Sequence, residues 1–206
     1  MTALLVRTCF EELSPGATDL SRLIRSYGMG VVPTEGGVAG CVSPEQFTAF
    51  YGAAFRDVHR YLLRAVLGDH ALAEDLTQDT FAVVVAASRA GRPEALSLAW
   101  VMGVARHKVI DHYRKASRDE RRLNLFAAEG DDVDDPQALV GKEPARIVQA
   151  LAGVRSEHRL VLVLKYLDDL TVDQIAAALG KSPRAIESLL ARARRALARE
   201  VQEVAS

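Results

Sequence analysis

Basic and small polar side chains repeat at helical spacing near the C-terminal end of this 206-residue sequence. At a step of about 100° per residue, four of them fall on one side of a predicted helix: Arg184, Ser188, Arg195 and Arg199. Guanidinium groups donate hydrogen bonds to phosphate oxygens and to base edges. The pattern therefore indicates contact with DNA, although a solvated surface helix that carries a row of arginines would show the same spacing.

The residues around this helix predict a helix-turn-helix. Thr171 and Gln174 form a capping-box pattern, and Gly180 suits the end of the helix that they begin. Ser182 and Pro183 suit the N-cap and first position of a second helix. Each helix has one apolar face, formed by Val172, Ile175, Ala176 and Leu179 in the first and by Ile186, Leu189, Leu190, Ala193 and Leu197 in the second. Packing through these faces would turn the arginines outward.

The composition favours packed helices and gives no sign of an enzyme. Apolar residues make up 49% of the chain, aromatic residues 6%, and the formal net charge is −1. The sequence contains no nucleophile–base pair, phosphate-binding glycine loop or zinc motif, so neither catalysis nor a cofactor is expected. His112 has no second ligand at a useful spacing, which argues against a metal site. Without a long apolar run or a signal-peptide pattern, we expect a cytoplasmic protein with no membrane insertion.

The chain divides into two helical blocks, a tail and a linker. Residues 1–43 are rich in glycine and form an N-terminal extension. Residues 44–118 form the first domain and residues 144–206 the second, which contains the helix-turn-helix. Residues 119–143 are rich in aspartate and read as an acidic linker. The predicted fold class is all-α, with two small helical domains on an acidic tether.

Residues that favour helix starts and helix ends give the expected elements of each block. In the first block we expect a helix from Ser43 to Gly68, a second from Asp69 to about Ser88, and a third from about Ala95 to Arg118. Three residues are expected to face inward from the second helix, namely Leu72, Leu76 and Val83. In the second block, residues 145–154 and 157–167 form two helices that bury the back of the helix-turn-helix.

Three motifs in this order resemble the extracytoplasmic-function group of the bacterial sigma-70 family. They are AEDLTQDTF (residues 73–81), WVMGVARHKVIDHYRK (residues 100–115) and LLARARRAL within the helix-turn-helix. The resemblance covers roughly residues 44–118 and 144–203. It implies a first domain equivalent to sigma region 2 and a last domain equivalent to sigma region 4.

The resemblance implies partners and site residues. A member of this family binds core RNA polymerase, and region 2 meets the −10 promoter element while region 4 meets the −35 element. Three residues match positions that contact polymerase: Asp75, Gln78 and Asp79. Seven match the part of region 2 that reads the −10 element: Arg106, His107, Lys108, His112, Arg114, Lys115 and Arg118. His107 departs from the asparagine expected there, and Trp100, which matches an aromatic position of the family, is expected in the core rather than against a base.

Seven residues of the helix-turn-helix match positions that approach the −35 major groove. They are Lys181, Ser182, Arg184, Glu187, Ser188, Arg192 and Arg195. Glu187 stands where many relatives carry a basic residue, so it either accepts from a cytosine amino group or pairs with a neighbouring arginine. The promoter sequence cannot be derived from these residues alone.

The resemblance also suggests regulation, and two other functional classes stay open. Relatives are held inactive by an anti-sigma factor, and we expect one for this chain. The aspartates Asp131, Asp132, Asp134 and Asp135 would mimic nucleic acid in a basic channel of polymerase. The alternatives are a stand-alone helix-turn-helix transcriptional activator, which would bind promoter duplex without polymerase, and a helical scaffold, which would show no salt-dependent association with DNA.

Overall fold

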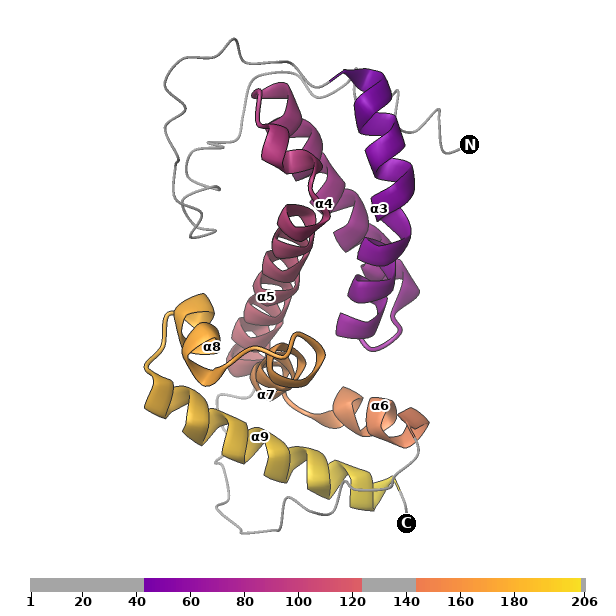
Figure 1. The fold of residues 1–206 in the computed structure, drawn as a ribbon. Coiled ribbons are helices and arrows are strands. Elements are labelled where there is room, and N and C mark those ends of the chain that lie inside the picture. The colour runs from indigo at the N-terminus through magenta and orange to yellow at the C-terminus, as the bar shows by residue number, and fades with distance from the viewer. Residues whose placement is uncertain (1–42, 124–143, 205–206) are drawn as a thin grey trace. The chain divides into compact units, whose positions relative to one another are not determined.

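The computed structural model describes residues 43–123 and 144–204 as a set of helices without strands, which confirms the predicted all-α class (Figure 1). The labels follow that figure. The elements are α3 (Pro44–Ala65), α4 (His70–Arg89), the 3₁₀ turn η1 (Pro93–Leu96), α5 (Leu98–Leu123), α6 (Pro144–Gly153), α7 (Ser156–Leu162), the π-helical turn η3 (Val163–Leu167), α8 (Val172–Leu179) and α9 (Pro183–Glu203). The chain forms two compact units, Met1–Val109 and Ile110–Ser206, which divide within α5.

In the first unit, α3 and α4 pack side by side and a leucine supplies the turn between them (Figure 1). The Gly68 N–H donates to the Leu63 carbonyl at 2.8 Å, and the Leu67 N–H donates to the Arg64 carbonyl at 3.2 Å, which is the Schellman pattern. Leu67 holds the left-handed position with φ of +59°. The helix therefore ends at Ala65, three residues before the predicted stop at Gly68, and Leu67 takes the left-handed position after the C-cap.

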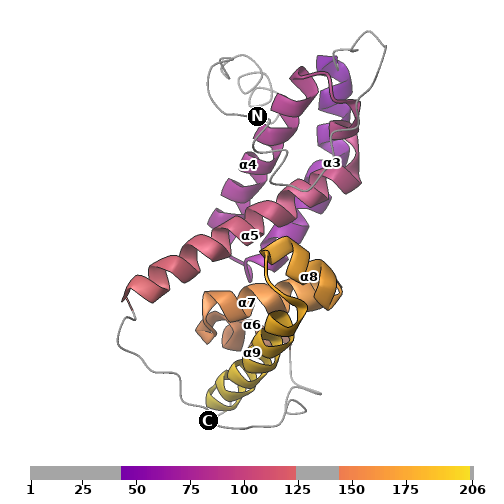
Figure 2. The ribbon, with the colours of Figure 1, turned by 90° about the vertical axis from the view of Figure 1, so that its left-hand side faces the viewer.

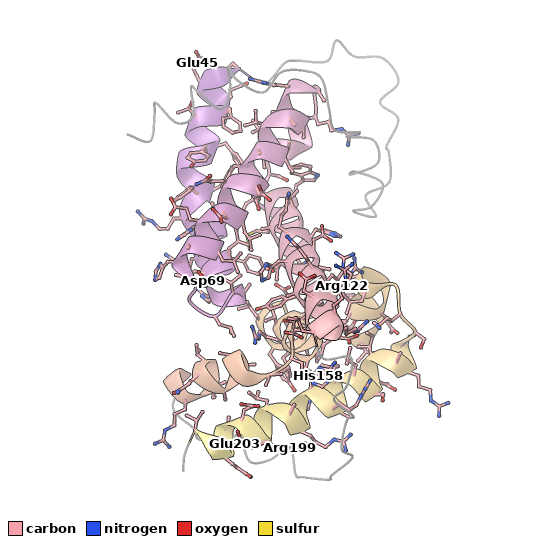
Figure 3. The ribbon with its side chains drawn as sticks, turned by 180° about the vertical axis from the view of Figure 1, so that it is seen from behind. Glu45, Asp69, Arg122, His158, Arg199 and Glu203 are labelled. Atoms are coloured by element: carbon pink, nitrogen blue, oxygen red, sulfur yellow. The ribbon has the colours of Figure 1, made fainter. Side chains whose placement is uncertain are left out.

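The inward face of α4 is more polar than the sequence pattern predicted. Asp69 accepts from the Leu72 N–H at 3.0 Å, which confirms the predicted cap (Figure 3). The buried residues of α4 include Leu76, Thr77 and Thr80, whereas Leu72 and Val83 are only half-buried. Each threonine hydroxyl donates to the carbonyl four residues earlier, at 2.6 Å and 2.7 Å. A threonine whose hydroxyl bonds to its own helix can be buried without an unsatisfied donor.

Helix α5 differs from its expected limits at both ends. It begins at Leu98, after the 3₁₀ turn, and the Trp100 N–H donates to the Ser97 hydroxyl at 3.3 Å. It continues to Leu123, past the expected end at Arg118 and into the segment assigned to the linker. Residues 124–143, which include the predicted aspartate cluster, lie outside the described residues, as does the extension up to residue 42.

The second unit is organised around α9, which packs against α6, α7 and α8 (Figure 2). All five residues predicted for its apolar stripe are buried: Ile186, Leu189, Leu190, Ala193 and Leu197. The predicted caps are confirmed. Thr171 and Gln174 form a complete capping box, Gly180 adopts the left-handed conformation, and Ser182 accepts from the Ala185 N–H at 3.2 Å. Helices α8 and α9 thus form the predicted helix-turn-helix.

Residues 157–167, predicted as one helix, form α7 followed by the π-helical turn η3. The Asp168 N–H donates to the Val163 carbonyl at 3.2 Å, a π-type bond across five residues. Asp169 then takes a positive φ of 50°, and the Lys165 ammonium donates to the Leu170 carbonyl at 3.1 Å. The π turn and the left-handed aspartate reverse the chain so that α8 can return against α9.

We predict that Gly180→Ala lowers the free energy of unfolding by about 1 kcal/mol, because an L residue with a Cβ is strained at φ of +63°. A Cβ at this position meets no atom within 4 Å, so backbone strain is the only expected cause. Urea unfolding followed by circular dichroism measures the change. Gly180→Asn is the matched control, since asparagine tolerates this conformation, and an equal loss in both variants would contradict the explanation.

Candidate nucleic-acid interface

The outward face of α9 carries side chains that are available for a ligand. Arg184 and Ser188 are exposed, and Arg195 is half-buried. Within the described parts of the chain, none of these three side chains has a hydrogen-bond or ion-pair partner. The apolar stripe fixes the rotation of the helix, so these side chains point away from α6, α7 and α8. A guanidinium without a protein partner keeps all its donors for phosphate or base edges.

The other predicted −35 residues either bond to groups within the protein or lie on its surface. Ser182 uses its hydroxyl as the N-cap of α9. Lys181 pairs with Glu157 of α7 at 3.3 Å. Glu187 is exposed, and no described residue pairs with it. Of its two expected roles, pairing with a neighbouring arginine is therefore not seen, and contact with a base stays a prediction. Arg192 is half-buried at the edge of the outward face.

An arginine of α9 that the sequence pattern did not select contacts an exposed tyrosine of the π turn η3. The Arg194 Nε donates to the Tyr166 hydroxyl at 2.8 Å, and the guanidinium carbon lies 5.9 Å from the ring centroid. Tyr166 lies within the π turn η3 and is 62% exposed. The pair holds one arginine of α9 against the π turn, and only the tertiary structure brings these two residues together.

The predicted −10 residues lie along α5 and fall into both units. Arg106, His107 and Lys108 belong to the first unit, where all three are half-buried. The Lys108 ammonium lies 3.3 Å from the Asp79 carboxylate on α4. Lys108 was predicted to meet DNA and Asp79 to meet polymerase, so this ion pair links the two expected surfaces within one unit.

Four predicted −10 residues belong to the second unit. Arg114, Lys115 and Arg118 are exposed, and His112 is half-buried. Arg114 donates to the Ala178 carbonyl at the end of α8, at 3.1 Å. The hydrogen bond directs Arg114 at the end of the first helix of the helix-turn-helix, which the sequence pattern did not predict.

The predicted polymerase residues share one exposed face of α4. Asp75, Gln78 and Asp79 are all exposed, although Asp79 also pairs with Lys108 of α5. Leu76 and Thr80 lie on another side of the helix and are buried. A ridge of polar side chains on a helix is suited to hydrogen bonds at the rim of an interface. Trp100 is 8% exposed and belongs to the core, as expected.

Both halves of this arrangement match known families of sequences. Residues 50–119 match sigma-70 region 2, and residues 145–197 match sigma-70 region 4. The chain is also 32% identical over 150 residues to the ECF RNA polymerase sigma factor SigC of Mycobacterium tuberculosis, an alignment that covers 72% of this chain and 80% of that protein. The chain belongs to the extracytoplasmic-function group of the sigma-70 family.

One further relative agrees with this assignment, and one solved structure resembles the chain. The ECF RNA polymerase sigma factor SigL of Mycobacterium tuberculosis is 30% identical over 182 residues, covering 81% of this chain and 96% of the relative. Among solved structures, the sigma factor RpoE in complex with the anti-sigma factor NepR from Bartonella quintana is 20% identical. It covers 77% of this chain and 98% of its own length, with a TM-score of 0.46.

The region 4 match contains a carboxylate that the sequence reading did not single out. Glu157, on α7, pairs with both Lys181 of the turn and Arg121 of α5. Burial raises the pKa of its carboxyl, but hydrogen bonds and charge from Arg121 and Lys181 together outweigh burial and hold the pKa below its ordinary value. The sequence offered no signal for this site, because Glu157 looked like an ordinary acidic residue in the first turn of a helix.

Tyr113 of α5 is buried in the same part of the second unit as Glu157. It is 2% exposed, and the Arg159 guanidinium lies 5.9 Å from its ring centroid. Burial raises the pKa of the Tyr113 hydroxyl, although the nearby Arg159 charge opposes the shift. Arg159 also donates to the Ala152 and Val154 carbonyls at 2.7 Å and 2.8 Å, so it satisfies the end of α6 as well.

The described residues also bear on metal binding and on membrane insertion. Within residues 43–123 and 144–204, no group of three histidine, cysteine or acidic side chains is placed to hold a metal ion. Over the same ranges, no helix combines the length and the apolar character needed to cross a membrane.

We predict that Glu157 stabilises the sigma factor at neutral pH and that this contribution disappears in acid. A carboxyl whose pKa is lowered on folding contributes stability above its unfolded pKa of about 4.3, and the contribution is lost as the pH falls through the folded pKa. Because the Arg121 and Lys181 side chains are 55% and 43% exposed, the effect should be about 1 kcal/mol or less. The measurement compares wild type with Glu157→Gln by urea unfolding between neutral pH and pH ~3. A difference that stays constant across this range would contradict the assignment.

Proposed function

We propose that the protein is an RNA polymerase sigma factor of the ECF type, which binds core polymerase and directs transcription initiation at a two-element promoter. The region 2 match, with α4 and α5, provides the polymerase-binding and −10 surfaces. The region 4 match provides the −35 surface through α9. Two weakly binding domains on one chain gain affinity because the second contact becomes intramolecular once the first has formed.

The outward face of α9 is the observation that carries this proposal. Arg184 and Arg195 have no partner in the described chain, while the opposite face of the same helix is fully buried. The capped turn at Gly180 and Ser182 positions the start of α9, where a recognition helix meets base edges. The two sigma-70 matches add that this element belongs to a protein with a region 2 upstream of it.

The proposal includes the regulation and location of the protein. We propose that it acts in the cytoplasm, has no catalytic activity of its own, and is held inactive by an anti-sigma factor. The names of its relatives support the transcriptional role, and one similar sigma factor was crystallised with an anti-sigma factor. The domain limits at residues 44–118 and 144–206 and the three sets of site residues are part of the same proposal.

The decisive experiment is transcription by purified core polymerase with and without this protein, followed by sequencing of the RNA 5′ ends. The expected result is a new set of start sites with a shared pair of upstream elements. Core polymerase that starts no new transcripts in its presence would refute the proposal. Specific binding of promoter duplex by the free protein, together with no effect on core polymerase, would instead identify a stand-alone activator.

We predict that Arg195→Ala weakens −35-dependent transcription by about 1–3 kcal/mol if the guanidinium reads a base. If it holds a phosphate, the slope of log affinity against log salt should fall by about one instead. Promoter titrations at several salt concentrations distinguish these two roles. Arg146→Ala is the control, because it removes one exposed charge from α6, outside the predicted −35 set. Equal effects of the two substitutions would indicate that only the total charge matters.

A further inference from the structure

A cavity of about 230 Å³ lies within the second unit, lined by the last turns of α5, by α7 and by the end of α8 with the turn that follows it. Its basic lining residues come from two parts of the chain: Arg114, Arg118 and Arg121 of α5, and Lys181 of the turn. Among the described residues, Glu157 of α7 is the one acidic member of the lining, so three positive charges remain in excess. A concave surface that carries one sign of charge concentrates ions of the opposite sign.

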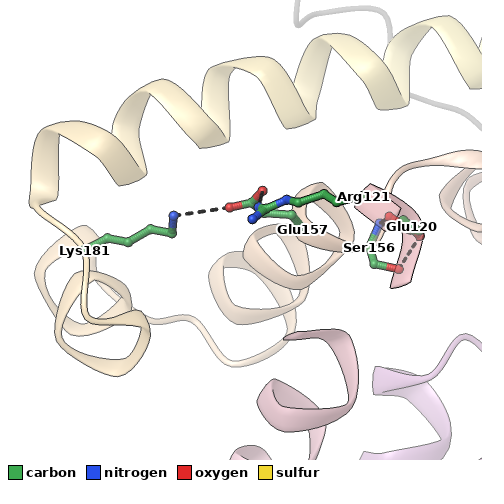
Figure 4. Close-up of polar contacts among 5 residues, drawn as sticks. All are labelled: Glu120, Arg121, Ser156, Glu157 and Lys181. Carbon is green, nitrogen blue, oxygen red and sulfur yellow. Dashed lines mark hydrogen bonds and ion pairs between the residues drawn. The ribbon is translucent and has the colours of Figure 1, made fainter. Parts of the chain in front are cut away.

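Polar contacts hold the walls of this cavity in place. The Glu120 carboxylate of α5 accepts from the Ser156 N–H of α7 at 3.0 Å and from the Ser156 hydroxyl at 2.6 Å (Figure 4). Glu157 lies between Arg121 and Lys181 and pairs with both (Figure 4). Two of the four cations are therefore positioned before a ligand binds, which reduces the side-chain entropy that binding would cost.

Two adjacent lining residues of α5 have no such partner. Ser117 is only 9% exposed, and no residue in the ranges 43–123 and 144–204 forms a hydrogen bond with its hydroxyl. Arg118 is exposed, and its guanidinium has neither a hydrogen bond nor an ion pair with the described residues. Buried polar groups in native proteins are nearly always hydrogen-bonded, so the Ser117 hydroxyl indicates an acceptor that is not part of the protein. A hydroxyl beside a guanidinium is suited to phosphate oxygens.

The size and the charge of the cavity favour a small anion with several charges. Pockets for drug-sized molecules have volumes of about 300–1,000 Å³, so this cavity admits a smaller group. A single phosphate group carries at most about two negative charges at neutral pH, which leaves part of the excess positive charge unbalanced. Two linked phosphate groups balance it more closely and present acceptors to several lining residues at once.

Contact with promoter DNA alone does not account for this arrangement. The sequence assigned Arg114 and Arg118 to the −10 element and Lys181 to the −35 element, whereas the structure places all three around one cavity. Each phosphate of a DNA strand carries one negative charge, and it is joined on both sides to the rest of the strand. A compact anion matches one small cavity with several cations better than two separate stretches of duplex do.

We infer that this cavity binds a diphosphate group, with the Ser117 hydroxyl and the Arg118 guanidinium as donors and the other three cations around it. The diphosphate is either inorganic pyrophosphate or the end of a nucleoside diphosphate whose base lies outside the cavity. The inference goes beyond the proposed sigma-factor function and does not rest on it. Arg184 and Ser188, which belong to the proposed −35 surface, do not line the cavity.

The test is isothermal titration calorimetry of the free, full-length protein at ~0.15 M salt without divalent cations. Inorganic pyrophosphate, ADP, orthophosphate and sulfate are titrated separately. Pyrophosphate or ADP should bind at least about tenfold more tightly than orthophosphate and sulfate. Tighter binding of ADP than of pyrophosphate would identify the nucleotide as the source of the diphosphate, and equal or weaker binding of ADP would identify the inorganic form. Similar affinities for all four anions, or no binding of either diphosphate, would overturn the inference.

Arg118→Ala tests the unpaired guanidinium. It should weaken diphosphate binding about tenfold or more, because hydrogen bonds between two charged groups are strong. The control is Arg122→Ala, which removes the same charge from an exposed position of α5 that is not part of the lining (Figure 3). Equal losses in the two variants would show that only the total charge matters, and they would refute the site.

Ser117→Ala tests the buried hydroxyl without changing the charge. Diphosphate binding should weaken about threefold or more, while the urea-unfolding midpoint of the ligand-free protein stays unchanged or rises. An unchanged affinity would contradict the role of Ser117 and with it the inference, as would a lowered midpoint, since that would indicate a partner within the protein. Transcription with core polymerase is a separate readout, so its failure would refute the proposed function and leave the diphosphate site standing.

Discussion

Burial of one stripe of α9 is the constraint on which the rest of the second unit depends. Ile186, Leu189 and Leu190 are each no more than 3% exposed, and together with Ala193 and Leu197 they fill the space between α6, α7 and α8. Because a helix is rigid, burying this stripe fixes the rotation of α9 about its axis. Arg184 and Ser188 must then face solvent, so the surface proposed to read DNA is a direct consequence of hydrophobic packing.

A second theme is that helix ends in this protein are satisfied by distant groups. Arg159 supplies donors to the last carbonyls of α6, and Glu120 supplies an acceptor to the first N–H of α7. Unsatisfied backbone groups at helix ends are expensive when buried, so these side chains tie neighbouring helices together more specifically than apolar contact does. Glu157 is held in a similar way, because its carboxylate lies between two cations, Arg121 and Lys181, that come from other parts of the second unit.

Local patterns in the sequence predicted much of the fold and part of the candidate site. The capping boxes at Ser43 and Thr171, the stop at Gly180 and the stripe of α9 are all present. These features depend on residues within one or two turns of each other, so the sequence contains all the necessary information. The inward face of α4 was partly wrong, because Thr77 and Thr80 are buried through hydrogen bonds to their own helix, which hydrophobic periodicity does not register.

The sequence alone determined the helix caps at Ser43, Asp69, Thr171 and Ser182, the apolar face of α9, and which basic residues share the opposite side of that helix. Tertiary structure decided where α5 ends, that Leu67 rather than Gly68 takes the left-handed cap, and that Glu120 and Glu157 meet partners on other helices. The reason is physical. Propensity, capping and amphipathic spacing act over a few residues, whereas Arg121 meets Glu157 across 36 residues of chain, and only the packing of whole helices sets which distant side chains come within reach.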